Sequence, residues 1–172
     1  MKEAEIMSIA VHEETQVFHL FNQEISYIMT VLPNGQLGQL YFGKRIHDRE
    51  NFSYLLEIRQ RAMASNPFEG DRRFSLEHVK QEYGVYGSTD YRYPAIEVLQ
   101  KNGSRISDFQ YQGYEVTEGK PKLPGLPATY TESPKEADTL AIFLKDPLTG
   151  VALKLLYTIF EGAGVIARSA WI

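Results

Sequence analysis

The sequence predicts a mainly β protein, an antiparallel β-sandwich that is supersandwich-like and incomplete and carries one or two short helices. Aromatic residues make up 12% of the 172 residues, and 11 of them are tyrosines, a composition that favours strands. Short apolar and β-branched runs recur between turn signals, which predicts about eight to eleven strands. Helical spacing is weak and confined to the middle of the chain.

The first four predicted strands cover 6–11, 17–20, 25–32 and 37–42. The polar residues between the first two mark a turn. Asn34 and Gly35 accept a positive φ at low cost, so they predict a tight turn after Pro33. The third and fourth strands should therefore pair as a hairpin.

Two further hairpins and a last strand are predicted at 96–99 with 105–109, at 139–144 with 151–160, and at 165–172. Asn102-Gly103 marks the turn of the first hairpin, and residues 146–150 mark the turn of the second. In the strand over 151–160, Leu153, Leu155 and Tyr157 alternate with Lys154, Leu156 and Thr158. One face of that strand should be apolar and the other partly so.

Helical spacing within 51–64 predicts a helix that ends at Asn66-Pro67. Residues 75–80 should form one or two helical turns with Ser75 as N-cap. Residues 113–135 are rich in proline and glycine. They should form a long, ordered excursion between strands rather than a domain boundary.

Composition excludes several classes of function. The net charge of −4 gives no reason to expect a nucleic acid or a membrane surface as partner. The absence of cysteine excludes disulfides and thiolate metal sites. The N-terminus lacks the apolar stretch of a signal peptide, and no apolar run approaches the length of a membrane span. We expect a cytoplasmic domain. Because 167–172 ends inside an apolar strand, we also expect a longer polypeptide to follow.

No catalytic motif is present. The sequence contains no G-x-S-x-G, P-loop or G-x-G-x-x-G pattern. The four histidines do not show metal-ligand spacing, and the paired acids such as Glu13 and Glu14 are typical of solvated turns. We therefore predict no catalytic residue, no metal and no cofactor on this chain.

Two clusters are candidates for binding. In 70–76, Arg72 could donate to a sugar hydroxyl beside Asp71. The alternative is a loop in which Asp71 pairs with Arg72 or Arg73 and cushions the next helix. The stretch 81–95, dense in Tyr, Gly and Pro, predicts a loop at a cleft or a subunit contact.

Within 81–95, Asp90, Tyr91 and Arg92 form the second cluster. Tyr91 could stack on the apolar face of a sugar while Asp90 accepts hydroxyl hydrogens. The alternative is a buried polar corner in which Arg92 pins the loop. The residues alone leave both interpretations open.

Many short segments, taken in order, resemble the N-terminal β-sandwich region of bacterial α-galactosidases of glycoside hydrolase family 36. The matching segments are 41–44, 71–72 with 74–76, 81–83, 86–87 with 89–92, 94–95, 119–121, 125–130, 155 with 157–158, and 165–166 with 168–169. Their order and spacing carry the resemblance across nearly the whole chain.

The resemblance implies a retaining α-galactosidase that hydrolyses terminal α-galactosides of the melibiose and raffinose type. Its catalytic (β/α)8 barrel would follow in the same polypeptide. Family members often form tetramers in which an N-terminal loop reaches the galactose pocket of a neighbouring subunit, and Arg72 is the main candidate for such a contact. Some members carry an acid before an Arg-Ala pair; Gln60 occupies that position here, so we expect no carboxylate there.

The alternative function is a stand-alone sugar-binding sandwich with Tyr83, Tyr86 and Tyr91 as platforms.

Overall fold

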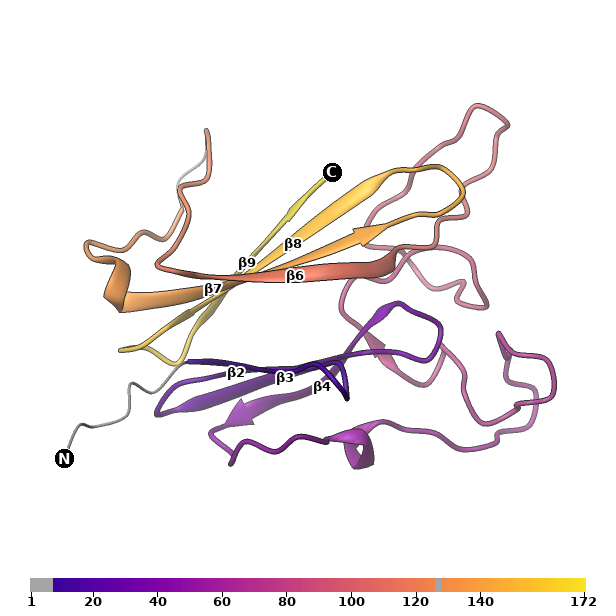
Figure 1. Cartoon of the computed structure of the whole chain (residues 1–172). Coiled ribbons are helices and arrows are strands. Elements are labelled where there is room, and N and C mark those ends of the chain that lie inside the picture. The colour runs from indigo at the N-terminus through magenta and orange to yellow at the C-terminus, as the bar shows by residue number, and fades with distance from the viewer. Residues whose placement is uncertain (1–7, 126–127) are drawn as a thin grey trace.

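Two antiparallel sheets stacked face to face form the protein (Figure 1). A computed structural model describes residues 8–125 and 128–172. The predictions for residues 6–7 and 126–127 lie outside the described residues. Nine strands occur in the described part of the chain. The predicted mainly β, sandwich-like fold is confirmed.

The first sheet is a meander whose strands follow one another in space as they do in the sequence. Its strands are β1 (Ile9–His12), β2 (Val17–Phe21), β3 (Ile25–Val31), β4 (Leu37–Lys44) and the short β5 (Lys80–Gln81). The predicted hairpin is confirmed as β3 and β4, and Gly35 adopts a φ of 84° in its turn. The register of the β3–β4 pair shifts between Ile28 and Met29, and this shift marks a β-bulge.

The second sheet is a four-stranded meander. Its strands are β6 (Gln110–Glu118), β7 (Ala137–Lys145), β8 (Ala152–Phe160) and β9 (Ile166–Trp171). The predicted hairpin around 146–150 and the predicted last strand are confirmed. Asp146 fixes the β7–β8 turn, because its Oδ1 accepts the backbone N–H groups of Leu148 at 2.8 Å and Thr149 at 3.1 Å.

The inner faces of the two sheets form one apolar core. Phe18, Leu20 and Met29 enter it from the first sheet, and Leu153 and Leu155 enter it from the second. The alternation predicted for β8 is confirmed. The outer face of that strand is also partly covered, because Leu156 and Thr158 are buried.

Residues 45–109 connect the two sheets through a long segment that contains only one short strand and one short helix. In Figure 1 this segment runs along the outer side of the first sheet and then gathers at one end of the sandwich. Phe52 packs against Val17 and Ile28, and Phe74 and Leu76 pack against Leu32. The segment therefore covers apolar side chains that the sandwich core leaves outside.

The helix predicted over 51–64 is wrong. Only a turn of 3-10 helix, η1 (Ser53–Leu55), forms there. Tyr54 and Ile58, which carried the helical spacing, are exposed. Most helical stability in proteins comes from burial of an apolar face, and two residues of the predicted face, Tyr54 and Ile58, are not buried. A second 3-10 turn, η2 (Pro134–Glu136), precedes β7.

Residues 75–80 form a single turn and not a helix. The N–H of His78 donates to the carbonyl of Ser75 at 3.2 Å. The Oγ of Ser75 accepts the N–H of Glu77 at 3.3 Å, so the predicted capping side chain does cap this turn. Residues 113–118 of the predicted excursion belong to β6, and the excursion is shorter than predicted.

The strands predicted at 96–99 and 105–109 are also wrong. The turn between them does form, with the N–H of Gly103 donating to Gln100 at 2.9 Å and a φ of 83° at Gly103. Leu99 and Ile106 are exposed. Because this turn lies against no sheet edge, its flanks have no ladder to join.

Candidate functional site

A closed loop over residues 66–74 presents Arg72. Asn66 closes its base, because its Nδ2 donates to the carbonyl of Phe74 at 2.9 Å. The rings of Phe68 and Phe74 are also in contact, with centroids 5.7 Å apart. Because Phe74 is buried, the base of the loop is anchored in the protein while its tip is exposed.

Within this loop the two neighbouring arginines differ. Arg73 donates to both oxygens of Asp71 at 3.1 Å, and these hydrogen bonds hold the pKa of the Asp71 carboxyl below its usual value. The guanidinium of Arg72 is exposed and makes no hydrogen bond or ion pair with any described residue. Arg72 therefore has its donors free for a partner, whereas Asp71 is already paired.

Asp90 and Arg92 form a partly buried polar corner. The Nε and Nη2 of Arg92 donate to the two carboxylate oxygens of Asp90, both at 2.8 Å. Gln81 donates to the same carboxylate. Burial opposes ionisation of Asp90, but the hydrogen bonds and charge of Arg92 hold its pKa below the usual value. This geometry matches the alternative interpretation of the second cluster.

The corner also connects the two predicted clusters. Arg92 Nη2 donates to the carbonyl of Leu76 at 2.8 Å, and Leu76 is fully buried just after the Arg72 loop. The structure thus brings Asp90 and Arg92 to the base of that loop. Substrate contact stays a prediction for all five candidate residues, which are Asp71, Arg72, Asp90, Tyr91 and Arg92.

Tyr91 is exposed over 62% of its surface, whereas Asp90 beside it is buried. Its ring meets the edge of Tyr86, with centroids 5.4 Å apart. Tyr83, by contrast, packs against the sandwich core. Of the three predicted platforms, Tyr91 offers the most open ring face.

The turn before Tyr91 is strained. Gly87 and Asp90 exchange backbone hydrogen bonds at 2.8 and 2.9 Å around Ser88 and Thr89, whose φ values are 51° and 76°. Left-handed backbone is costly for residues with a Cβ, and more so for a β-branched one. The surrounding contacts therefore hold the tip of this segment in a conformation that Asn-Gly would adopt more easily.

Glu82 is a buried acid that the sequence did not single out. Its side chain is 1% exposed. Its Oε1 accepts the hydroxyl of Tyr27 at 2.6 Å, and its Oε2 accepts the hydroxyl of Tyr157 and the Nη2 of Arg168, both at 2.8 Å. Burial and the neighbouring carboxylate raise the pKa of Tyr27, so both tyrosines act as neutral donors.

No local pattern marks Glu82, because its partners lie far away in the sequence. The available signal was indirect. Arg168 interrupts the apolar strand β9, and a charged side chain in such a strand needs a partner. The sequence gives no means of identifying which acid supplies that partner.

A second polar cluster lies on the outer side of the first sheet. The buried His19 contacts Asp48 through Nδ1 at 2.7 Å and Ser26 Oγ through Nε2 at 2.9 Å. His12 reaches the same carboxylate at 3.0 Å. Burial lowers the pKa of His19, although Asp48 opposes that shift.

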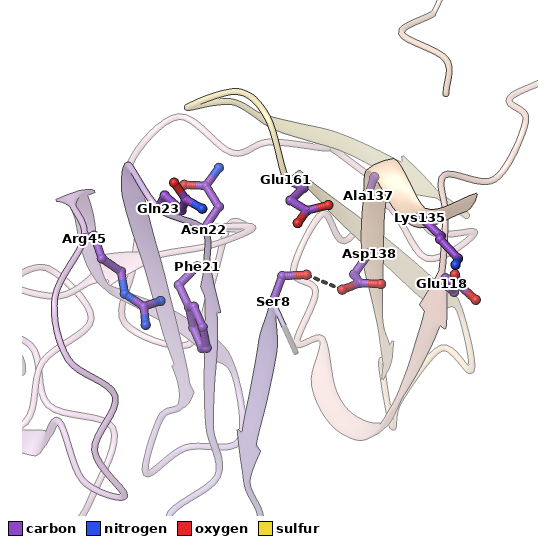
Figure 2. Close-up of a pocket in the computed structure, with 10 residues that line it drawn as sticks. All are labelled: Ser8, Phe21, Asn22, Gln23, Arg45, Glu118, Lys135, Ala137, Asp138 and Glu161. Carbon is purple, nitrogen blue, oxygen red and sulfur yellow. Dashed lines mark hydrogen bonds between the residues drawn. The ribbon is translucent and has the colours of Figure 1, made fainter. Parts of the chain in front are cut away.

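A cleft of about 670 Å³ opens between the two sheets at one end of the sandwich. Figure 2 shows Arg45 and Phe21 on its first-sheet side, facing Asp138, Glu161 and other residues of the second sheet. The guanidinium of Arg45 lies 3.7 Å from the centre of the Phe21 ring. None of the residues that we predicted to bind substrate lines this cleft.

Within residues 8–125 and 128–172, no group of three or more His, Asp or Glu side chains could hold a metal ion. In the same part of the chain, no helix has the length and hydrophobicity needed to cross a membrane.

Comparison with known proteins gives a consistent result. The model of the "Glycosyl hydrolase family 36 N-terminal domain" matches residues 35–172. The chain is 43% identical over 164 residues to "Alpha-galactosidase AgaA" of Geobacillus stearothermophilus, which covers 95% of this chain and 22% of that protein.

Solved structures agree with this match. An α-galactosidase from Lactobacillus brevis superposes with a TM-score of 0.90 at 38% identity, covering 94% of this chain and 22% of that one. A variant of AgaA in complex with raffinose gives a TM-score of 0.83 at 43% identity, covering 90% of this chain and 21% of that one. The chain thus spans about a fifth of the length of these relatives.

Proposed function

Because the chain belongs to the glycosyl hydrolase family 36 N-terminal domain family, we propose that it is the non-catalytic N-terminal domain of an α-galactosidase. The complete protein would hydrolyse terminal α-galactosides of the melibiose and raffinose type. The catalytic groups would lie on a (β/α)8 barrel of the same polypeptide, and the subunits would assemble into a homo-oligomer. The observation that carries the proposal is the match over nearly the whole chain to α-galactosidases of which it covers only about a fifth.

We further propose that the Arg72 loop completes the substrate pocket of a neighbouring subunit. Arg72 carries an exposed guanidinium that no described residue binds, and its loop is anchored at the base by Asn66 and Phe74. A planar guanidinium can donate two hydrogen bonds to adjacent sugar hydroxyls. Asp71, held by Arg73, would support the loop beside that contact.

The test uses the full-length polypeptide with an Arg72→Ala change. A hydrogen bond from a charged donor contributes about 1.5–3 kcal/mol, so we expect kcat/KM for a chromogenic α-galactoside to fall about 10- to 100-fold. The melting temperature should change little, because Arg72 is exposed. Arg105→Ala, which removes another exposed arginine of the same segment, is the matched control. An unchanged kcat/KM in Arg72→Ala would contradict the pocket role.

Subunit mixing tests whether the contact is made between subunits. Arg72→Ala subunits retain an intact barrel, and subunits with an inactivated barrel retain Arg72. Oligomers reassembled from both should recover activity above that of either parent if the contact is in trans. No recovery from demonstrably mixed oligomers would place the contact within one subunit.

The stand-alone sugar-binding module remains a second candidate because of the open ring of Tyr91. Calorimetric titration of the 172-residue chain with raffinose distinguishes the two functions. Tight binding that is lost in Tyr91→Ala would favour the binding module. The pocket proposal expects no such binding, since most of the pocket would lie on the barrel.

A further inference from the structure

Glu82 has no role in the function proposed above, yet its buried carboxylate accepts hydrogen bonds from Tyr27, Tyr157 and Arg168. Its carboxylate joins three strands. Tyr27 belongs to β3 in the first sheet, whereas Tyr157 and Arg168 belong to β8 and β9 in the second. Arg168 also donates to the backbone carbonyl of Glu82 at 3.0 Å, which fixes the main chain at this point.

Hydrogen bonds alternating with short stretches of the main chain lead from Glu82 to the Arg72 loop. Gln81, the neighbour of Glu82 in the chain, donates to Asp90. Asp90 holds Arg92, and Arg92 donates to the carbonyl of Leu76. Leu76 lies two positions after Phe74, whose carbonyl accepts a hydrogen bond from the side-chain amide of Asn66 at the base of the loop.

The ion pair between the buried Glu82 and the half-exposed Arg168 is weak evidence for a role in stability. Replacing such a pair by apolar residues of similar volume is often neutral or stabilising. A buried pair with fixed directions instead specifies one arrangement of the elements it joins. Here those elements are the two sheets and the start of the segment that carries Asp90 and Tyr91.

We propose that Glu82 is a positioning residue for Arg72. By tying the main chain at the end of β5 to both sheets, it sets the position of the Asp90–Arg92 corner and, through Leu76, the direction in which the Arg72 loop projects. This inference rests on the pocket role proposed for Arg72. Glu82 itself does not contact substrate.

The test is a double-mutant cycle in the full-length polypeptide with Glu82→Gln and Arg72→Ala. Glu82→Gln keeps the shape of the side chain and removes its charge. We expect it to raise KM for the chromogenic α-galactoside about five- to tenfold with a smaller change in kcat. In the Arg72→Ala background the same change should alter KM less than about twofold, because coupled residues are not additive.

The control is Glu97→Gln, which breaks the exposed Glu97–Arg105 pair, 3.0 Å apart, on the same segment. It should leave KM unchanged in both backgrounds. If Glu82 served stability only, Glu82→Gln would lower the melting temperature and change KM by the same factor with and without Arg72. Equal factors would overturn the inference. An Arg72→Ala change without effect would instead overturn the pocket role.

A milder variant covers the case in which Glu82→Gln does not fold. Tyr27→Phe removes one hydrogen bond to Glu82 and leaves the ion pair with Arg168 intact. We expect KM to rise about twofold, and this rise should again disappear in the Arg72→Ala background. A rise that persists there would count against the inference.

Discussion

The two sheets and the segment that joins them, residues 45–109, are held together in different ways. The sheets bury one continuous set of apolar side chains and form long backbone ladders. The joining segment has few backbone ladders. Apolar side chains such as Phe52, Phe74 and Val85 anchor it, and polar side chains such as Asn66, Glu82 and Arg92 fix it between these anchors. Burial of apolar surface stabilises the framework of two sheets, whereas directional polar contacts determine the path of the loop segment on that framework. The candidate binding residues all lie in the joining segment.

A cavity in the sandwich should have the largest effect on stability. Leu140 in β7 is fully buried in the core between the sheets. Leu140→Ala should lower the free energy of unfolding by about 2–5 kcal/mol, since it removes apolar contacts and leaves a void. Urea denaturation followed by circular dichroism measures this.

Val116→Ala is the matched control for Leu140→Ala, because Val116 lies at the exposed end of β6. Its effect should stay within about 0.5 kcal/mol. Similar losses in the two variants would mean that the sandwich core does not dominate stability.

Removing the polar anchor of the segment should have a smaller and more local effect. Arg92→Gln leaves the buried Asp90 with Gln81 and frees the carbonyl of Leu76. We expect a loss of about 1 kcal/mol, below the usual range for charged hydrogen bonds, because the arginine side chain is half exposed. Hydrogen exchange should quicken at 76–92 and not in β7 or β8.

The stability that the Asp90–Arg92 pair contributes should decrease at low pH. Arg92 holds the pKa of Asp90 below its usual value, so the stability that this pair gives is complete above the unfolded pKa and is lost as pH falls through the folded one. The protection factors of the amides at 76–92, which are corrected for the intrinsic pH dependence of exchange, should therefore fall below about pH 4. Arg92→Gln should weaken that acid response, and an unchanged response would assign it to another group.

The outer surface of the first sheet should respond to pH in a different range. Burial lowers the pKa of His19, so the unfolded chain binds the proton more readily and stability falls as pH drops below about 6.5. In the neutral ring, Nδ1 can donate to Asp48 while Nε2 accepts from Ser26. Protonation would remove that acceptor.

The expected loss is about 1.4 kcal/mol for each unit by which the folded pKa lies below the unfolded one. His19→Gln should remove this dependence of the melting temperature between pH 5 and 7. His47→Gln, at an exposed position, should leave it in place. If both variants kept the wild-type slope, another group would be responsible.

Relaxing the strained turn should have the smallest effect and the opposite sign. Thr89→Gly removes the Cβ from a residue with a φ of 76°. The gain from relief of strain, less the entropy cost of glycine, should be up to about 1 kcal/mol of added stability. Differential scanning calorimetry should show a higher melting temperature.

The control for that turn is Thr117→Gly in β6, where the backbone is extended. It should lower stability by about 0.5–1 kcal/mol. If both glycine variants lowered stability, Thr89 would not be strained in the way its φ indicates.

The strands could be predicted from the sequence because their signals are local. Alternation in β8, Asn34-Gly35 in the β3–β4 turn and the turn residues 146–150 each depend on neighbouring positions only. The resemblance to the family was likewise carried by short segments read in order. The helix over 51–64 failed for the opposite reason, since its spacing required a buried face that Tyr54 and Ile58 do not have.

The candidate site was predictable only in part. The sequence by itself placed Asp71, Arg72, Asp90, Tyr91 and Arg92 on loops. Only the tertiary structure decided that Asp90 is buried and bound to Arg92, that Arg72 has no partner among the described residues, and that Glu82 lies between the sheets. The strand pattern follows from each residue's own polarity and backbone preference. The state of a charged side chain instead depends on residues brought to it by folding, as Tyr27, Tyr157 and Arg168 are brought to Glu82.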